Sequence, residues 1–454
     1  MRAGLKHLRR ILLASALLAA GAGQVSAETL IEAMVSAYSS NPTLQAERAR
    51  QRSTDELVPQ ALSGWRPTVN TEGSIAKVWT DASGQPDTEN DPKSVAIGLS
   101  QPIFRGFKTI NGTKAAEASV EAGKQNLLAI EQDILFQAIQ AYMNVIRDRQ
   151  IVGLRQQNVN VLRQQLNAAD ERFKVGEITR TDVAQARANL GEAQSNVASA
   201  NATLAASVAN YINVVGHKPG SLKYPRLAKL PRNLEAAQAA AMEINPNILA
   251  AAYVEEASNY NIEVVKGDLL PFASVDASAT FNDNPSVGIS RSESARIEGV
   301  LTIPLYEAGR VYSSVREAKH IASQRRLEVI QAGRSVRESV SISWNNLAAA
   351  REIIRSAKEQ VSASVLALDG VRQEYLVGSR TTLDVLDAET EVVTARIVLV
   401  SAERDQIVAA YQILGSIGRL TARDLSLPVE YYDADENYLN VRGKWFGTGA
   451  DIIE

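Results

Sequence analysis

Cysteine is absent from all 454 residues of the sequence. Disulfide bonds therefore cannot stabilise the protein, and thiolate metal sites, cysteine nucleophiles and a lipid-modified amino-terminal cysteine are excluded. Histidine is almost as scarce: the chain has only His7, His217 and His320. Their spacing matches neither a zinc site nor a Ser/His/Asp arrangement. The sequence therefore predicts a protein that is not an enzyme and that binds no cofactor or metal.

Long apolar runs are missing as well, because nothing beyond the first 27 residues approaches the roughly 20 consecutive apolar residues of a membrane-spanning helix. The other structure that can cross hydrocarbon is a closed β-barrel, whose strands of about 10 alternating residues give a much weaker sequence signal. Alternating strands are therefore the feature that would attach this chain to a membrane.

Residues 1–27 have the pattern of a secretory signal peptide. An apolar run over 11–20 follows four basic residues, and Val25-Ser26-Ala27 ends in small residues suited to cleavage after Ala27. Without the four basic residues the chain keeps 44 Lys+Arg against 51 Asp+Glu, a net charge of −7. An acidic exported chain offers no electrostatic footprint for nucleic acid.

The exported chain contains two copies of one unit. Asn41-Pro42 recurs as Asn245-Pro246, and Gln101-Pro102-Ile103-Phe104 is answered by Ile303-Pro304-Leu305-Tyr306. We assign residues 28–216 to the first repeat and 245–418 to the second, joined by a linker over 217–244. Residues 419–454 have no counterpart in the repeat and are interpreted as a peripheral carboxyl-terminal tail.

Each repeat has two stretches that alternate between apolar and polar residues, as a sheet between two different solvents would. The predicted strands are 68–79, 94–104, 272–281 and 295–304. Prolines that mark the boundaries between these strands and the neighbouring helices are Pro67, Pro102, Pro271 and Pro304. The hairpin connections 81–93 and 282–293 are polar and are predicted to be exposed loops. Four strands cannot close a membrane barrel, so either several chains share one barrel or the sheet is not a barrel.

Very long helices are the other large feature. No proline interrupts 309–375, which allows a helix of roughly 100 Å. Apolar residues at spacings of three and four lie on both sides of the Val-Gly turns at 175–176 and 377–378, as in Val183, Ala186, Leu190 and Ala193. This pattern is typical of antiparallel coiled-coil hairpins with tips near 174–182 and 376–387.

The two tips differ in charge. Thr179-x-x-Asp182 and Thr381-x-x-Asp384 both fit a helix-capping box, which alone would be a structural feature. The second tip, however, has Tyr375, Arg380 and Asp387 where the first has Phe173, Ile178 and Gln185. Capping requires none of these changes, whereas a charged constriction with its own locking contacts would.

With these motifs, the sequence resembles the TolC family of outer-membrane efflux channels over nearly all of residues 28–420. Residues 375–387 resemble the family's periplasmic entrance motif, and 173–183 resemble its first-repeat partner. The resemblance implies an α+β membrane protein: a homotrimer whose three four-stranded sheets form one twelve-stranded β-barrel in the outer membrane, continued into the periplasm by an α-helical coiled-coil tunnel.

The resemblance also implies roles for the tip residues. Asp384 and Asp387 would form a ring at the pore constriction, and Tyr375 and Arg380 would lock the gate through Thr181 and Asp182. Expected partners are outer-membrane lipid, a periplasmic adaptor (membrane fusion) protein and an inner-membrane transporter of the RND or ABC type. The function implied is export of drugs or proteins by a tripartite efflux or type I secretion system. A periplasmic coiled-coil adaptor or scaffold is the alternative, since it too would show helical hairpins behind a signal peptide.

Overall fold

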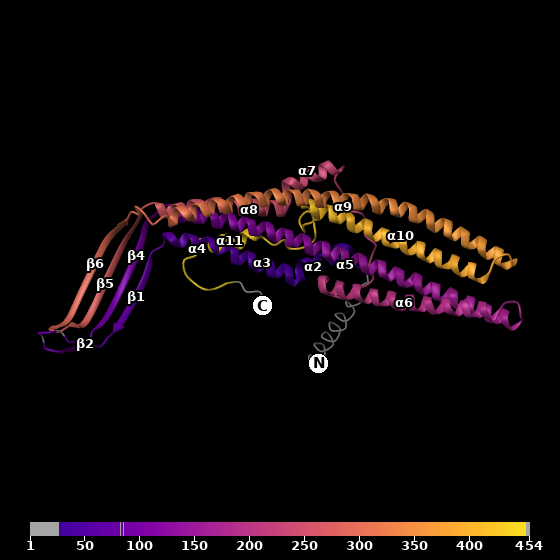
Figure 1. Cartoon of the computed structure of the whole chain (residues 1–454), viewed down its shortest axis with the longest axis horizontal. Coiled ribbons are helices and arrows are strands. Elements are labelled where there is room, and N and C mark those ends of the chain that lie inside the picture. The colour runs from indigo at the N-terminus through magenta and orange to yellow at the C-terminus, as the bar shows by residue number, and fades with distance from the viewer. Residues whose placement is uncertain (1–26, 82, 85, 451–454) are drawn as a thin grey trace, which may run out of the picture. The chain divides into compact units, whose positions relative to one another are not determined.

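A computed structural model describes residues 27–81, 83–84 and 86–450 (Figure 1). The predicted signal peptide lies outside the described residues apart from Ala27. The described chain forms two compact units, each assembled from three segments. The first unit contains residues 27–41, 132–234 and 341–429, and the second contains 42–131, 235–340 and 430–450. None of the helices in the described ranges is both long enough and apolar enough to span a membrane.

A four-stranded antiparallel sheet lies in the second unit (Figure 1). Its strands, in spatial order, are β1 (Thr68–Ile75), β4 (Lys93–Arg105), β5 (Phe272–Ser286) and β6 (Ile289–Thr302). Two strands come from each repeat, and the repeats meet where β4 pairs with β5. A separate short hairpin pairs β2 (Val78–Thr80) with β3 (Thr88–Asn90).

The strands deviate from the sequence-based ranges mainly at the end where the hairpins turn. The exposed loop predicted over 282–293 is wrong, because β5 and β6 stay paired as far as Ser286 and Ile289. Val287 and Gly288 make the connection, and Gly288 has the positive φ of 83° that a tight turn requires. Polar residues suggested a loop here, but strands exposed to water tolerate them.

The register of the sheet agrees with the alternation read from the sequence. Val275 lies opposite Gly299 and Ala277 opposite Ile297, so the predicted apolar residues of β5 and β6 share one face. Val95, Ile97 and Leu99 of β4 continue that face, and all three side chains are exposed in the single chain. This face is an apolar surface that the described chain itself does not cover.

The predicted junction prolines fall in two kinds of position. Pro67 and Pro271 directly precede β1 and β5, where a missing backbone N–H costs no sheet hydrogen bond. Pro304 follows β6 by two residues. Pro102 instead lies inside β4, where the pairing with β5 shifts register between Pro102 and Phe104. A β-bulge there accommodates a residue that cannot donate to the ladder.

Helices accompany the sheet in the second unit. They are α3 (Pro42–Asp55), α4 (Leu57–Leu62), α8 (Pro246–Lys266), α11 (Ala434–Arg442), most of α7 (Leu234–Ile244) and the first parts of α5 (Lys108–Lys174) and α9 (Arg310–Leu376), with 3₁₀ turns η1 (Ser63–Trp65) and η2 (Gly267–Leu269). The repeated Asn-Pro motif places proline at the first position of both α3 and α8, where its fixed φ suits a helix start.

The carboxyl-terminal segment is not a peripheral tail throughout. Leu420 and Leu427 are buried in the first unit, and α11 packs on α3 and α4 in the second. Asn437 of α11 donates to Asp55 at 2.7 Å, and Arg442 donates to Glu117 at 2.8 Å. Interpretation from sequence failed here because these partners lie more than 300 positions away in the chain.

The first unit is built from helix pairs. It contains α2 (Leu30–Ser40), α6 (Arg180–Val215), α10 (Thr382–Ile417) and the remaining parts of α5 and α9. The α5 and α6 segments run side by side, as do α9 and α10 (Figure 1). The predicted seam of the first pair is confirmed, since Val159, Leu162, Val183 and Ala186 form one buried cluster.

Candidate functional site

Both helical hairpins turn in the same way. Gly176 donates its N–H to the carbonyl of Phe173 at 3.0 Å, and Glu177 donates to Arg172 at 2.9 Å. Gly378 and Ser379 repeat these bonds in the second hairpin. Both glycines have φ near 80°, a left-handed conformation that glycine adopts without strain. This pairing of bonds is a Schellman motif, which ends α5 and α9 at matching positions.

A capping box then starts the returning helix at each tip, as the sequence predicts. The Thr179 side chain accepts from the N–H of Asp182, while the Asp182 carboxylate accepts from the N–H of Thr179 at 2.8 Å. Thr381 and Asp384 make the same reciprocal pair, also at 2.8 Å. Each tip is therefore a turn in which hydrogen bonds satisfy backbone groups at the end of one helix and at the start of the next.

The caps hold two carboxylates in their ionised form. Hydrogen bonds from the Thr179 hydroxyl and backbone N–H lower the pKa of Asp182. Hydrogen bonds from the Thr381 backbone and hydroxyl lower the pKa of Asp384. Asp387 lies three residues after Asp384 on the same side of α10 and is exposed. The second tip thus carries two neighbouring carboxylates, whereas the first has Gln185 in place of Asp387.

The expected locking residues contact other partners in the described chain. The Tyr375 hydroxyl accepts a hydrogen bond from Arg172 of α5 and lies 3.4 Å from the Thr382 hydroxyl. Arg380 donates to Glu374 of its own tip at 2.7 Å. Asp182 is engaged in its cap. The ties expected from Tyr375 and Arg380 to Thr181 and Asp182 are not formed within one described chain.

Arg172 is the tip residue that the sequence reasoning missed. Its guanidinium carbon lies 5.0 Å from the centre of the Tyr375 ring, so a cation–π contact accompanies the hydrogen bond between α5 and α9. Arg172 also donates to Glu177 at 2.9 Å, which raises the pKa of the guanidinium. The repeat comparison contained a signal, because Arg172 corresponds to Glu374 and the charge reverses between the copies.

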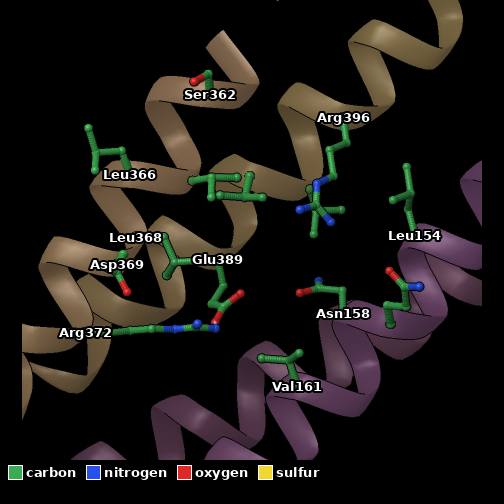
Figure 2. Close-up of a pocket in the computed structure, with 14 residues that line it drawn as sticks. Leu154, Asn158, Val161, Ser362, Leu366, Leu368, Asp369, Arg372, Glu389 and Arg396 are labelled. Carbon is green, nitrogen blue, oxygen red and sulfur yellow. The ribbon is translucent and has the colours of Figure 1, made fainter. Parts of the chain in front are cut away.

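A groove of about 580 Å³ lies between α5 and the α9–α10 pair (Figure 2). Its walls are mostly apolar, but Figure 2 shows Arg372 and Glu389 meeting on one side and Asn158 extending from α5 on the other. Glu389 is buried, and Arg372 neutralises it by an ion pair. Asn158 is 5 % exposed, and its side-chain oxygen has no hydrogen-bond partner among the described residues. The α5 helix is thus separated from α9–α10 by an incompletely filled space.

Sequence comparison defines the class of protein to which this fold and these tips belong. The profile of the family described as outer membrane efflux protein matches residues 33–217 and 238–419, the two repeats in turn. The chain therefore belongs to the outer membrane efflux protein family, and the predicted resemblance is confirmed. It is a channel protein of the outer membrane rather than an enzyme or a periplasmic adaptor.

Individual relatives cover almost the whole chain. The outer membrane efflux protein BepC of Brucella suis is 39% identical over 442 residues, which are 96% of this chain and 96% of the relative. Outer membrane protein TolC of Escherichia coli is 26% identical and matches 88% of this chain and 84% of its own length. The alkaline protease secretion protein AprF of Pseudomonas aeruginosa is 22% identical over 78% of this chain and 75% of AprF.

Solved structures share the fold. The CmeC outer membrane channel of Campylobacter jejuni superimposes with a TM-score of 0.79 at 15% identity, covering 91% of this chain and 89% of CmeC. The MtrE outer membrane channel of Neisseria gonorrhoeae, solved in its open state, gives 0.72 at 18% identity over 86% of this chain and 88% of MtrE. The predicted combination of a four-stranded sheet with long helical hairpins is confirmed by these likenesses.

Proposed function

We propose that three copies of this chain form one gated tunnel for efflux or type I secretion. Their sheets close into a twelve-stranded barrel in the outer membrane, and their helical hairpins extend the tunnel into the periplasm. The four-stranded sheet is the observation that carries the proposal. Its exposed apolar face suits lipid, while β1 and β6 each leave one edge unpaired within the sheet. Pairing β1 of one chain with β6 of the next satisfies both edges.

The second tip forms the selective constriction of the proposed tunnel. In a trimer Asp384 and Asp387 bring six carboxylates together, and the Thr381 cap already favours the ionised form of Asp384. A ring of negative charge lowers the energy of cations in the pore and raises that of anions.

Asp387→Ala tests the ring without disturbing a cap, because Asp387 takes no part in the capping box. We expect the variant to lose most of its preference for cations over anions in single-channel recordings, and Asp384→Ala with Asp387→Ala to lose all of it. Asp182→Ala is the matched control, since it removes the equivalent cap carboxylate from the first tip. Unchanged selectivity in the double variant would overturn the ring assignment.

The tips also supply the surface for a periplasmic adaptor, which couples the tunnel to an RND or ABC transporter in the inner membrane. Val175 and Val377 support this role, since their apolar side chains are 72 % and 81 % exposed at the two turns. A photo-crosslinker placed at each of these positions should capture an adaptor in intact cells, whereas one at Leu439 of α11 should not. Absence of any adduct from both tips would contradict tip docking.

A further inference from the structure

Two aromatic side chains near the carboxyl terminus stand out in the second unit. Trp445 is 57 % exposed and Phe446 is 87 % exposed, although large aromatic side chains gain most from burial. The proposed efflux function leaves both residues without a role.

The structure nevertheless holds this segment in one place. Arg66 donates to the backbone carbonyl of Lys444 at 2.9 Å, and its guanidinium carbon lies 4.9 Å from the centre of the Trp445 ring. On the amino-terminal side, α11 is fixed to α5 by the ion pairs Lys124–Asp435 and Arg442–Glu117. These contacts therefore position the Lys444 backbone and the Trp445 ring, and Phe446 follows Trp445 directly.

That position is the base of the sheet. Arg66 precedes the first residue of β1 by two positions, and the register places the start of β1 and β5 at the same end as the close of β4 and β6. Other large side chains are exposed just beyond these strand ends, including Phe107 at 51 % and Tyr306 at 80 %. Trp445 and Phe446 thus add to a band of exposed aromatic residues beside the sheet.

The length of β4 relates this band to a bilayer. Its 13 residues run from Lys93 to Arg105 and extend about 40 Å along the strand. A strand tilted by about 45° crosses roughly 28 Å, close to the thickness of the hydrocarbon core. The charged residues Lys93 and Arg105 mark the two ends of β4, because charged side chains stay outside the hydrocarbon core. The base of the sheet, at Arg105, therefore falls at a membrane–water interface, where tryptophan is enriched.

We propose that Trp445 and Phe446 form a lipid-binding anchor that inserts at the boundary between headgroups and acyl chains of the periplasmic leaflet. Arg66 and Lys444, the basic residues beside the aromatic pair, favour anionic phospholipid headgroups there. The inference rests on the proposed barrel, because the barrel sets the level of the membrane. It adds a second, carboxyl-terminal attachment between the helical part of the protein and the bilayer.

The absence of native cysteine allows a direct test with single-cysteine variants of the full chain. Phe446→Cys carries a polarity-sensitive fluorophore, and the trimer is placed in phosphatidylethanolamine–phosphatidylglycerol vesicles with nitroxide quenchers near the top or the end of the acyl chain. We expect the shallow quencher to remove most of the emission and the deep quencher to remove little. Adding Trp445→Ala should weaken the shallow quenching.

Two further variants separate the outcomes. Leu439 of α11 is 69 % exposed, and a label at Leu439→Cys should stay unquenched in the same vesicles. Ile97→Cys on the apolar face of β4 should be quenched deeply if the barrel exists. Quenching at Ile97 without quenching at Phe446 overturns the anchor but leaves the barrel intact.

Two other results also overturn the anchor. In the first, neither the lipid quenchers nor aqueous iodide quench the label at Phe446. The residue is then covered by protein, either a neighbouring copy or a periplasmic partner, and not by lipid. If neither Ile97 nor Phe446 is quenched, the barrel fails together with the anchor.

Discussion

At the scale of single residues, contacts between distant parts of the chain decide how the first unit is held together. Arg172 and Tyr375 join α5 to α9 near the tips although 203 positions separate them in sequence. Arg380, by contrast, donates to and forms an ion pair with Glu374, which lies six residues earlier in the same tip. The two basic residues should therefore differ in their effect on a gate.

Arg172→Ala should raise single-channel conductance or the fraction of time spent open, because the variant loses both the hydrogen bond and the cation–π contact to Tyr375. Tyr375→Phe should have a smaller effect, since the ring remains for the guanidinium. Arg380→Ser is the control and should leave conductance closer to that of the native protein. A larger effect at Arg380 than at Arg172 would place the lock elsewhere.

Glu28 is a second residue whose contacts span the first unit. Its carboxylate accepts a hydrogen bond from Tyr211, whose ring is fully buried, and lies 3.6 Å from His217. Its carbonyl accepts from Lys223 at 2.9 Å and from Tyr142 at 2.7 Å. Burial raises the pKa of Tyr142 to about 12 and also raises that of Tyr211, so both hydroxyls remain protonated donors at neutral pH.

Glu28→Ala should destabilise the packing of residues 220–223 against Glu28 by about 1–3 kcal/mol, because it leaves the buried Tyr211 hydroxyl without its acceptor. Hydrogen exchange of the amides in 220–223 measures the loss. Glu28→Gln keeps an oxygen acceptor and should exchange more slowly than Glu28→Ala. Equal exchange in the native protein and in Glu28→Ala would show that the carboxylate contributes nothing to the stability of this segment.

At the scale of elements, each tip depends on one capping box. Thr179→Ala removes the side-chain acceptor at the start of α6, which typically costs about 1 kcal/mol, or about fivefold in local exchange rate. Amides in the first turn of α6 should exchange faster by that factor, while the first turn of α10, with its intact Thr381 cap, serves as an internal reference. Faster exchange in both helices would instead show that the variant destabilises the whole first unit and not the α6 cap alone.

Acid should weaken both caps in the native protein. Hydrogen bonds within the caps lower the pKa of Asp182 and Asp384 below the ordinary aspartate value of 3.8, so the caps contribute fully above that pH. Their contribution is lost as pH falls through the depressed folded pKa. Hydrogen exchange should therefore show the first turns of α6 and α10 protected at pH 5 and progressively less protected below about pH 4. Asp182→Asn should make the α6 turn insensitive to pH in this range.

At the scale of the whole molecule, the cysteine-free sequence permits a test of the proposed barrel. Within one chain β4 and β5 separate β1 from β6 by about 14 Å, too far for a disulfide, whose Cα atoms lie within about 7 Å. Cysteine at 69, 71 or 73 of β1, combined with Leu301→Cys in β6, should give covalent trimers at the matching register after oxidation. Single-cysteine variants should not form trimers, and failure at all three registers would argue against closure by β1 and β6.

The sequence by itself determined the features that depend on local pattern. The duplication is visible because the same motifs recur in both halves of the chain. The apolar face of β5 and β6, the α5–α6 seam and both capping boxes follow from spacings of two to four residues, which backbone geometry translates directly into faces and caps. Local polarity was misleading at 282–293, because exposed strand ends and loops have similar compositions.

Only the tertiary structure decided which distant residues meet. The docking of α11, the Arg172–Tyr375 contact and the position of Trp445 against Arg66 join segments up to 378 positions apart. Side chains at such separations leave no periodic signal, since their proximity depends on the packing of every element between them. Carboxyl-terminal residues that look peripheral in sequence thus become fixed parts of the second unit.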